Sequence, residues 1–217
     1  PYVITLSVIS ILYGGLLAIG QTDLKRLIAY TSISHFGFIV LGIFAFTSQG
    51  QSGATLYMVN HCLSTVALFL IFGFMITRRG SRNIGDFGGV QKPAPILAGV
   101  FMVAGLSALA LPGLSTFVSE FLVLVGTYSR YRVAGVLATL GVILAALYIL
   151  LMYQRTMTGP VRPAVEGFPE IRRRELVVVA PMLALIVVLG VFPQPLLEVI
   201  NHGVNPTLEE AGVSDPP

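Results

Sequence analysis

The sequence is poor in charged residues and contains a single cysteine. Charged residues make up 11% of its 217 residues, hydrophobic residues make up 55%, and the mean hydropathy is +0.85. So little polar surface cannot cover a globule in water, which excludes a soluble protein. The lone Cys62 excludes a disulfide framework, an iron–sulfur cluster and a cysteine-based zinc site within this chain. Cys62 itself is expected to be a small buried hydrophobe.

Six segments are apolar enough to cross a bilayer, which takes about 20 residues. They are residues 3–20, 27–46, 54–76, 96–128, 133–153 and 176–192. The sequence therefore predicts an all-α polytopic membrane protein with one six-helix domain over residues 1–192. The polar residues 193–217 are expected to form a loosely ordered tail on the outer side. Because the chain begins Pro1-Tyr2-Val3, with neither a Met nor a signal sequence, we expect it to be a piece of a longer protein.

The few basic residues are unevenly placed. Eleven of the thirteen share one side if the six helices alternate in direction, and only Arg130 and Arg132 lie on the other side. The eleven are Lys25, Arg26, Arg78, Arg79, Arg82, Lys92, Arg155, Arg162, Arg172, Arg173 and Arg174. The positive-inside rule makes the side with eleven basic residues cytoplasmic or its organellar equivalent. The alternative is that these basic clusters are ordinary flanks of the helices and do not report orientation. The basic residues do not form one solvated patch, so nucleic acid is not an expected partner.

The fourth segment is too long for one straight crossing. A helix over all of residues 96–128 would run about 50 Å, and Pro112 and Gly113 stand near its middle. Proline removes an amide donor and glycine allows non-helical geometry. We interpret the segment as two half-helices joined by an unwound stretch that points inward. A simple proline kink is the alternative.

Glu120 is an acidic residue inside an apolar segment, with no basic residue within nine positions on either side. A charged, unpaired carboxyl at this depth costs several kcal/mol, so the group must be protonated, hydrated or paired across helices. Burial opposes its ionisation, while the start of the second half-helix and any cation on another helix favour it. Glu120 is therefore a candidate proton-loading site. The alternative is a carboxyl that snorkels or serves as a permanent packing strut.

Two histidines lie in polar stripes that follow helical spacing. The first, His35, follows Tyr30 and adjoins Ser34, and the second, His61, lies on a stripe with other polar side chains. The members of that second stripe are Tyr57, His61, Ser64 and Thr65. Hydroxyls and imidazoles in register suit a proton relay, because histidine titrates near neutral pH. Interhelical hydrogen bonding and haem ligation by the two histidines are the alternatives.

Lys25 lies at the cytoplasmic start of the second span, with Asp23 close enough to pair with it. One interpretation makes Lys25 an uptake-side member of a proton path. The other makes it a membrane anchor of the positive-inside kind.

Four motifs resemble the antiporter-like membrane subunits of the proton-translocating NADH–quinone oxidoreductase, respiratory complex I. They are residues 23–38 (DLKRLIAYTSISHFGF), 60–64 (NHCLS), 84–89 (IGDFGG) and 111–121 (LPGLSTFVSEF). The resemblance covers nearly the whole chain in order. A glutamate at the Glu120 position resembles the M-type branch, also called chain 4, because the other branches and the Mrp cation antiporter subunits carry a lysine there.

The resemblance implies two inverted five-helix repeats, each with a broken helix that bears an ionisable residue. This chain resembles the second repeat plus a closing helix. Glu120 then matches the exit-side ionisable group, His35 and His61 match relay histidines, and Lys25 matches a motif lysine. The lysine and glutamate of the first repeat are absent from this chain.

The resemblance also implies proton translocation without a redox cofactor or a metal in this chain. NADH, FMN, iron–sulfur clusters and quinone are expected in partner subunits. The expected partners are other membrane-arm subunits, the lipid bilayer and the chain's own first repeat. The expected location is a bacterial cell membrane or an organellar energy-converting membrane. A cation/proton antiporter or a hydrogenase-linked subunit is the alternative within the same superfamily, and a structural membrane bundle is the alternative outside it.

Overall fold

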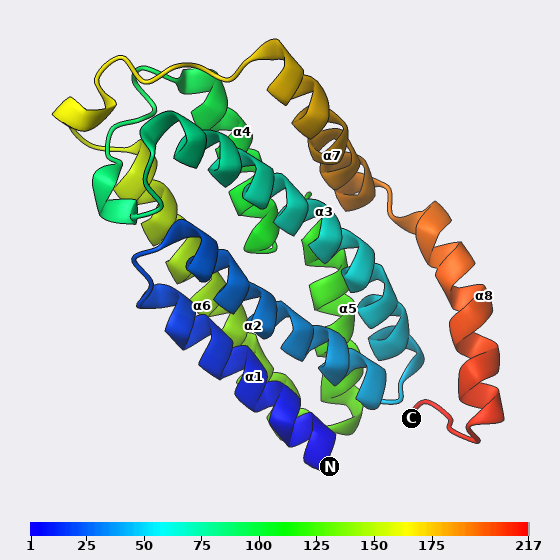
Figure 1. Ribbon diagram of the computed structural model, residues 1–217. Coiled ribbons are helices and arrows are strands. Elements are labelled where there is room, and N and C mark those ends of the chain that lie inside the picture. Colours follow the sequence, from blue (N-terminus) through cyan, green and yellow to red (C-terminus); the bar gives the residue numbers. More distant parts are fainter. Residues whose placement is uncertain (217) are drawn as a thin grey trace.

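The chain forms an elongated bundle of helices in a computed structural model that describes residues 1–216 (Figure 1). These residues contain eight α-helices, two short 3-10 helices and no strand. The α-helices are α1 (Tyr2–Ile19), α2 (Leu24–Phe44), α3 (Ser48–Arg79), α4 (Pro95–Ala108), α5 (Ser115–Arg130), α6 (Arg132–Met157), α7 (Arg173–Val191) and α8 (Gln194–Glu210). Five of them, α1, α2, α3, α6 and α7, are long and apolar enough to cross a membrane. The prediction of an all-α protein with several membrane-crossing helices is confirmed.

Local chemistry sets the helix ends. The Asp23 carboxylate accepts hydrogen bonds from the first amides of α2, those of Lys25 and Arg26, at 2.8 and 3.1 Å. Thr47 caps α3 in the same way, and α3 ends at Gly80, whose φ of 74° is left-handed. Such geometry suits glycine because it has no Cβ to clash with the following carbonyl.

The 96–128 segment is divided between α4 and α5, with residues 109–114 outside both helices. In this connection Ala110 and Gly113 have left-handed φ values of 59° and 91°. The α7 backbone packs directly on the connection, because a Cβ on Gly190 would collide with the Gly113 carbonyl. The chain therefore leaves helical geometry here within packed protein.

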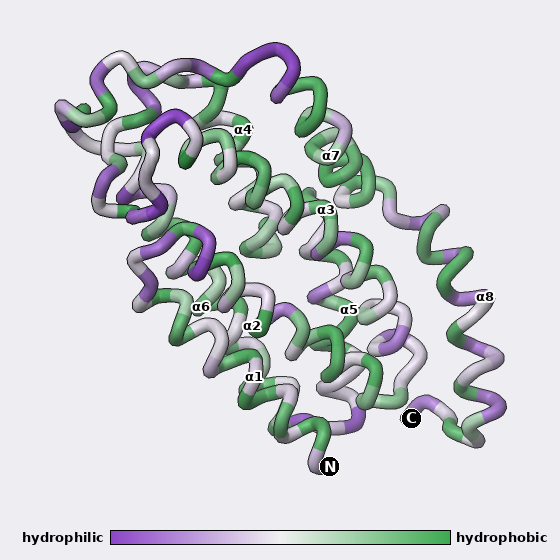
Figure 2. Tube along the Cα trace, in the orientation of Figure 1, coloured by the Kyte–Doolittle hydropathy of each residue, from purple (hydrophilic) through white to green (hydrophobic). Residues whose placement is uncertain are grey.

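The three connections that carry most basic residues meet at one end of the bundle. The α1–α2 connection pairs with the α3–α4 loop through Leu24 N–H to Arg82 O at 3.0 Å and Ile84 N–H to Thr22 O at 2.7 Å. The α3–α4 loop, which contains η1 (Ile84–Asp86), also bonds to the α6–α7 loop, which contains η2 (Pro163–Val165). Hydrophilic residues gather in these loops, away from the apolar length of the helices (Figure 2).

The prediction of a loosely ordered tail is wrong for Gln194–Glu210, which form α8 beside α3 (Figure 1). The apolar residues Ile200, Val204 and Leu208 recur every fourth position and form a small buried cluster with Leu56 of α3. Of the polar residues between them, Asn201 accepts a hydrogen bond from Ser52 of α3 at 2.6 Å, and the others are exposed. The tail is thus an amphipathic helix, and its spacing outweighs its polar composition.

Candidate functional site

Buried polar side chains gather in the middle of the bundle, where α2, α3, α5 and α6 meet. Glu120 of α5 is 2% exposed, and the histidines at positions 35 and 61 are also buried. The structure therefore brings together the three principal residues predicted from the sequence.

The Glu120 carboxylate has one hydrogen-bond partner among the described residues. The Tyr57 hydroxyl, from α3, donates to Glu120 Oε2 over 2.8 Å. The other oxygen, Oε1, has no partner there. The described residues contain two ion pairs, Arg78–Glu175 and Arg82–Asp23, and neither involves Glu120. No basic side chain among these residues neutralises the Glu120 carboxylate.

Glu120 also lines a cavity of about 360 Å³ between α5, α6 and the α4–α5 connection. The connection contributes residues 109–112, and α6 contributes Thr139. The α4–α5 connection, which contains Pro112, and Glu120 therefore lie beside the same cavity.

His35 continues the hydrogen-bonded chain from Tyr57. Its Nδ1 lies 2.7 Å from the Tyr57 hydroxyl oxygen, and its Nε2 lies 3.3 Å from the hydroxyl oxygen of Tyr148 on α6. All four side chains of the series Tyr148, His35, Tyr57 and Glu120 are buried. Four helix-borne groups thus form one continuous series of short polar contacts.

His61 stands beside this series and is not hydrogen-bonded to it. Its ring centroid lies 5.0 Å from that of His35, and its Nδ1 lies 3.2 Å from the Thr65 hydroxyl. The adjacent Cys62 is exposed, so the expectation of a buried thiol is wrong. The reason is helical geometry, because a face that turns His61 inward turns the next residue about 100° away.

Close approach of α3 and α5 positions Tyr57 against Glu120. A Cβ on Gly53 of α3 would lie 2.8 Å from the Val123 amide nitrogen and 3.0 Å from the Ser119 carbonyl oxygen, so the two backbones touch. One turn from Tyr57, the Asn60 side chain donates to the carbonyl of Ser115, the first residue of α5, at 2.7 Å. Helix α3 thus fixes both the start and the middle of α5.

Four other predicted residues lie outside the hydrogen-bonded series. Lys25 is exposed at the start of α2, ten residues or about 15 Å along the helix from His35. Tyr30 is half-buried against the apolar core toward that end. Ser34 donates to the Ile11 carbonyl of α1 at 2.9 Å, and Ser64 donates to the His61 carbonyl of its own helix at 3.2 Å. The two serines therefore serve backbone groups in this structure.

Tyr148 is the member of the series that sequence reasoning missed. It is buried, and no other tyrosine precedes it in the predicted segment of residues 133–153. A phenol alone among aliphatic residues needs a polar partner when it is buried, and that signal was available in the sequence.

The two histidines do not fit a shared haem. Their rings lie side by side at 5.0 Å, and both nitrogens of His35 face tyrosine hydroxyls at short range. Axial ligation needs a free nitrogen on each ring and a porphyrin between them, and the tyrosines and the ring contact fill that space.

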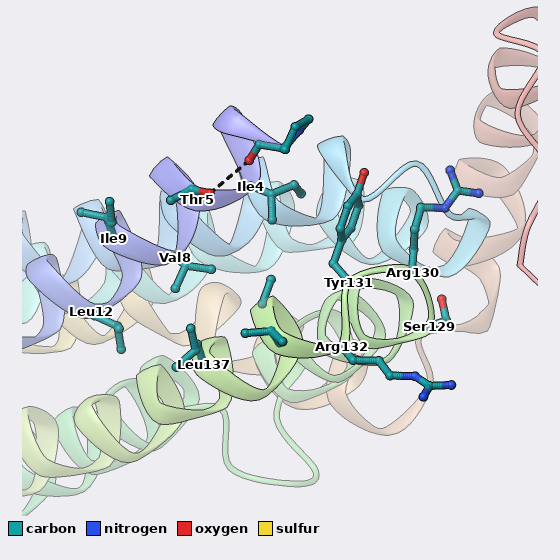
Figure 3. A pocket seen from close by; sticks show the side chains of 13 residues that line it. Ile4, Thr5, Val8, Ile9, Leu12, Ser129, Arg130, Tyr131, Arg132 and Leu137 are labelled. Atoms are coloured by element: carbon teal, nitrogen blue, oxygen red, sulfur yellow. Dashed lines mark hydrogen bonds between the residues drawn. The ribbon is translucent and has the colours of Figure 1, made fainter.

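A larger cavity, of about 740 Å³, lies away from the series (Figure 3). It is bounded by Ile4 and Val8 of α1, the α5–α6 turn and Leu137 of α6, with Arg130 and Arg132 at one edge. None of the four members of the series lines it. The larger of these two cavities is therefore not the one that the buried carboxyl lines.

Apolar helices around a buried carboxyl and two imidazoles define a polytopic membrane protein with a titratable interior. Residues 1–147 match the family described as "NADH:quinone oxidoreductase/Mrp antiporter, TM". The chain belongs to this family, and the resemblance drawn from its motifs is confirmed.

Three relatives illustrate the range of the family. Subunit M of the NADH-quinone oxidoreductase of Mycobacterium tuberculosis is 57% identical over 216 residues, which are 100% of this chain and 39% of that protein. A chain of respiratory complex I from Thermus thermophilus is 32% identical with a TM-score of 0.85, over 93% of this chain and 44% of that chain. A chain of the Mrp complex from a Dietzia species is 24% identical with a TM-score of 0.82, over 95% of this chain and 47% of that chain. At this identity the likeness is one of fold alone. The chain thus spans about two fifths of the curated relative.

Proposed function

We propose that this chain translocates protons as part of the membrane arm of an NADH–quinone oxidoreductase. The observation that supports the proposal most directly is the buried series in which Tyr57 joins the Glu120 carboxylate to His35 over 2.8 and 2.7 Å. A carboxyl held in protein at membrane depth without a cation partner is a typical proton-binding group. Relatives named as subunits of NADH-quinone oxidoreductase supply the chemical context.

In this proposal the chain moves protons and no electrons. A proton taken up from the side rich in basic residues reaches His35 and then loads Glu120, whose Oε2 faces the relay. Oε1 has no hydrogen-bond partner among the described residues. The cavity beside the α4–α5 connection, which Glu120 lines, serves as the route of release. Changes of charge in neighbouring groups drive loading and release, because the energy of a buried charge depends strongly on its neighbours. His61, whose ring contacts His35, is positioned to act as such a neighbour.

The proposal treats α4 and α5 as one broken crossing. Together with the five longer apolar helices they would give six crossings, with the tail helix α8 on the outer side. Neither half is long enough to span alone, since α4 has 14 residues and α5 has 16. Irregular backbone at this depth is stable when it is packed in protein or faces a wet cavity. Residues 109–112 line the cavity beside Glu120, and α7 packs on Gly113.

The remaining components belong to other chains in this proposal. NADH, FMN, iron–sulfur clusters and quinone would be held by partner subunits, and other membrane-arm subunits and the chain's own first repeat would adjoin this bundle. The membrane would be a bacterial cell membrane or an organellar energy-converting membrane. The chain's contribution is then a non-redox step of a translocating enzyme.

The test is Glu120→Gln in the intact complex, reconstituted in vesicles and driven by NADH. Glutamine keeps the shape of the side chain and removes its titration, so we expect proton pumping per electron to fall by roughly tenfold or more while assembly survives. Glu166→Gln, in the exposed α6–α7 loop, is the matched control and should pump normally. A Glu120→Gln complex that pumps at the normal ratio would show that the carboxyl is a packing strut.

A cation/proton antiporter is the second candidate, favoured by the fold shared with the Mrp complex. It predicts that vesicles exchange Na⁺ for protons through the intact protein without NADH. Proton movement that depends on NADH and is indifferent to Na⁺ would reject it.

A further inference from the structure

The Tyr57 hydroxyl is the only connection between the imidazole and the carboxyl among the described residues. It lies 2.7 Å from His35 Nδ1 and 2.8 Å from Glu120 Oε2, and no other side chain in the described part of the chain bonds to that carboxylate. A phenol has one proton to donate, so it cannot donate to both neighbours at once. The direction of one bond therefore fixes the direction of the other.

Two arrangements of protons satisfy these contacts. When Glu120 is ionised it can only accept, so Tyr57 donates to it, and His35 must carry its proton on Nδ1 and donate to the tyrosine oxygen. When Glu120 is protonated it donates to Tyr57, which then donates to an Nδ1 without a proton. In that second arrangement His35 carries its proton on Nε2 and donates to the hydroxyl oxygen of Tyr148, 3.3 Å away. Loading the carboxyl thus reverses every bond and changes the tautomer of His35.

We propose that Tyr57 is an obligatory proton relay between His35 and Glu120, and that it makes the series pass one proton at a time. The inference rests on the proposed function and specifies how its central site works. A hydronium ion supplies a proton to His35 Nε2, and the N–H bond at Nδ1 breaks as that proton moves to the tyrosine oxygen. The tyrosine's own O–H bond breaks as its proton joins Glu120 Oε2. One proton has entered at His35 Nε2 and another has reached Glu120 Oε2. His35 and Tyr57 are both neutral after the transfer.

The spacing of the contacts gives the series a direction. His35 is held at 2.7 Å on the Tyr57 side and at 3.3 Å on the Tyr148 side, so Nε2 is the more weakly bonded nitrogen and the one open to an arriving proton. After a transfer Nε2 is already protonated and cannot accept another proton. Before a second transfer His35 must give up the proton on Nε2 and carry one on Nδ1 again. This change of tautomer between transfers prevents protons from passing continuously to the Glu120 carboxyl.

The test is Tyr57→Phe in the full complex, compared with Glu120→Gln and with the double variant. Phenylalanine keeps the ring, whose centroid lies 5.8 Å from that of His35, and removes only the hydroxyl. We expect pumping per electron to fall to the level of Glu120→Gln, and the double variant to be no worse than either, because both changes interrupt one step. Tyr131→Phe, on a half-buried tyrosine at the α5–α6 turn and outside every predicted path, should pump normally.

Assembly is checked separately, by the amount of complex in the membrane and its NADH oxidation with an artificial electron acceptor. If Tyr57→Phe pumps normally while Glu120→Gln does not, the relay through Tyr57 is wrong and the proposed function stands. If Glu120→Gln pumps normally, the proposed function itself fails. If Tyr57→Phe lowers pumping only by lowering the amount of complex, the hydroxyl is structural and the inference is overturned. A double variant that is much worse than both single variants would also contradict it.

Discussion

Two glutamates in this chain have opposite surroundings. Glu175, at the start of α7, is held by both terminal nitrogens of the Arg78 guanidinium and accepts the Arg172 amide at 2.7 Å. Glu120, in the middle of the bundle, has one phenolic partner and no cation within residues 1–216. The first carboxylate has its charge neutralised by a fixed partner, as suits a structural clamp. The second is hydrogen-bonded to a phenol and has no cation beside it among the described residues, as the proposed proton-binding role requires.

The Arg78 clamp joins three parts of the loop end. Besides Glu175, the guanidinium donates to the carbonyls of Pro169 and Glu170 at 3.0 and 3.1 Å. The Glu170 carboxylate in turn caps the amides of Ile96 and its neighbour at the start of α4, at 2.8 and 2.9 Å. Paired charges hold the loops at this end, whereas the mid-bundle series joins one carboxyl, one imidazole and two hydroxyls without a cation. The predictions that follow test this division of roles.

Arg78→Met should have the largest effect on stability. The Arg78 side chain is 8% exposed and that of Glu175 is 21% exposed, so the variant strands a partly buried carboxylate. We expect a loss of about 3 kcal/mol, near the low end for a broken buried pair because Glu175 keeps some solvent contact. The measurement is thermal unfolding of the full-length subunit in detergent. Arg174→Met, at an exposed position one residue before Glu175, is the control and should change little.

Gly53→Ala should disturb the mid-bundle series without touching the clamp. The added Cβ would meet the Val123 amide nitrogen at 2.8 Å, so α3 and α5 must separate and the Tyr57–Glu120 bond must lengthen. We expect pumping to fall by about tenfold, since small displacements of reacting groups are costly, while the complex still assembles. Gly73→Ala, on the same helix with nothing within 4 Å of the new Cβ, should pump as the parent does. Equal losses in the two variants would reject the close contact as the cause.

Ala110→Gly should have the smallest effect, and it should be favourable. Ala110 has a φ of 59° in the α4–α5 connection, where a side chain crowds the following carbonyl. Removing the Cβ should stabilise the subunit by about 0.5–1 kcal/mol after the added freedom of the unfolded chain is deducted. Ala104→Gly, inside α4 with helical geometry, should destabilise it by about 1 kcal/mol or more. Thermal unfolding of the subunit in detergent distinguishes the stabilisation expected of Ala110→Gly from the destabilisation expected of Ala104→Gly.

The parts of the site that the sequence predicts are those in which one residue conflicts with its surroundings. Glu120 lies in an apolar segment after Pro112 and Gly113, so its importance follows from the cost of burying a charge. His35 and His61 follow from polar spacing along single helices. In each case the signal is local, and the structure places all three residues close together.

The pairings between helices did not follow from the sequence. Tyr57 was predicted from its own stripe, but its bond to Glu120 depends on how closely α3 and α5 cross. Tyr148 joins from α6 for the same reason, and Ser34 turns toward α1 although it adjoins His35 in sequence. Helix α8 was missed because its polar composition hid an apolar residue at every fourth position. Interhelical contacts of this kind are tertiary information, which a periodic pattern on one helix does not contain.

Tying the three basic loops together at one end makes the bundle an electrical dipole. That end carries eleven basic residues against five acidic ones, Asp23, Asp86, Glu166, Glu170 and Glu175. The opposite end carries two basic residues, Arg130 and Arg132, against three acidic ones, Glu209, Glu210 and Asp215. A cationic rim lowers the local concentration of hydronium and draws anionic phospholipid headgroups to itself. In the proposed function a proton that enters at this rim would move against the charge of the rim, and anionic headgroups bound there would offset that charge.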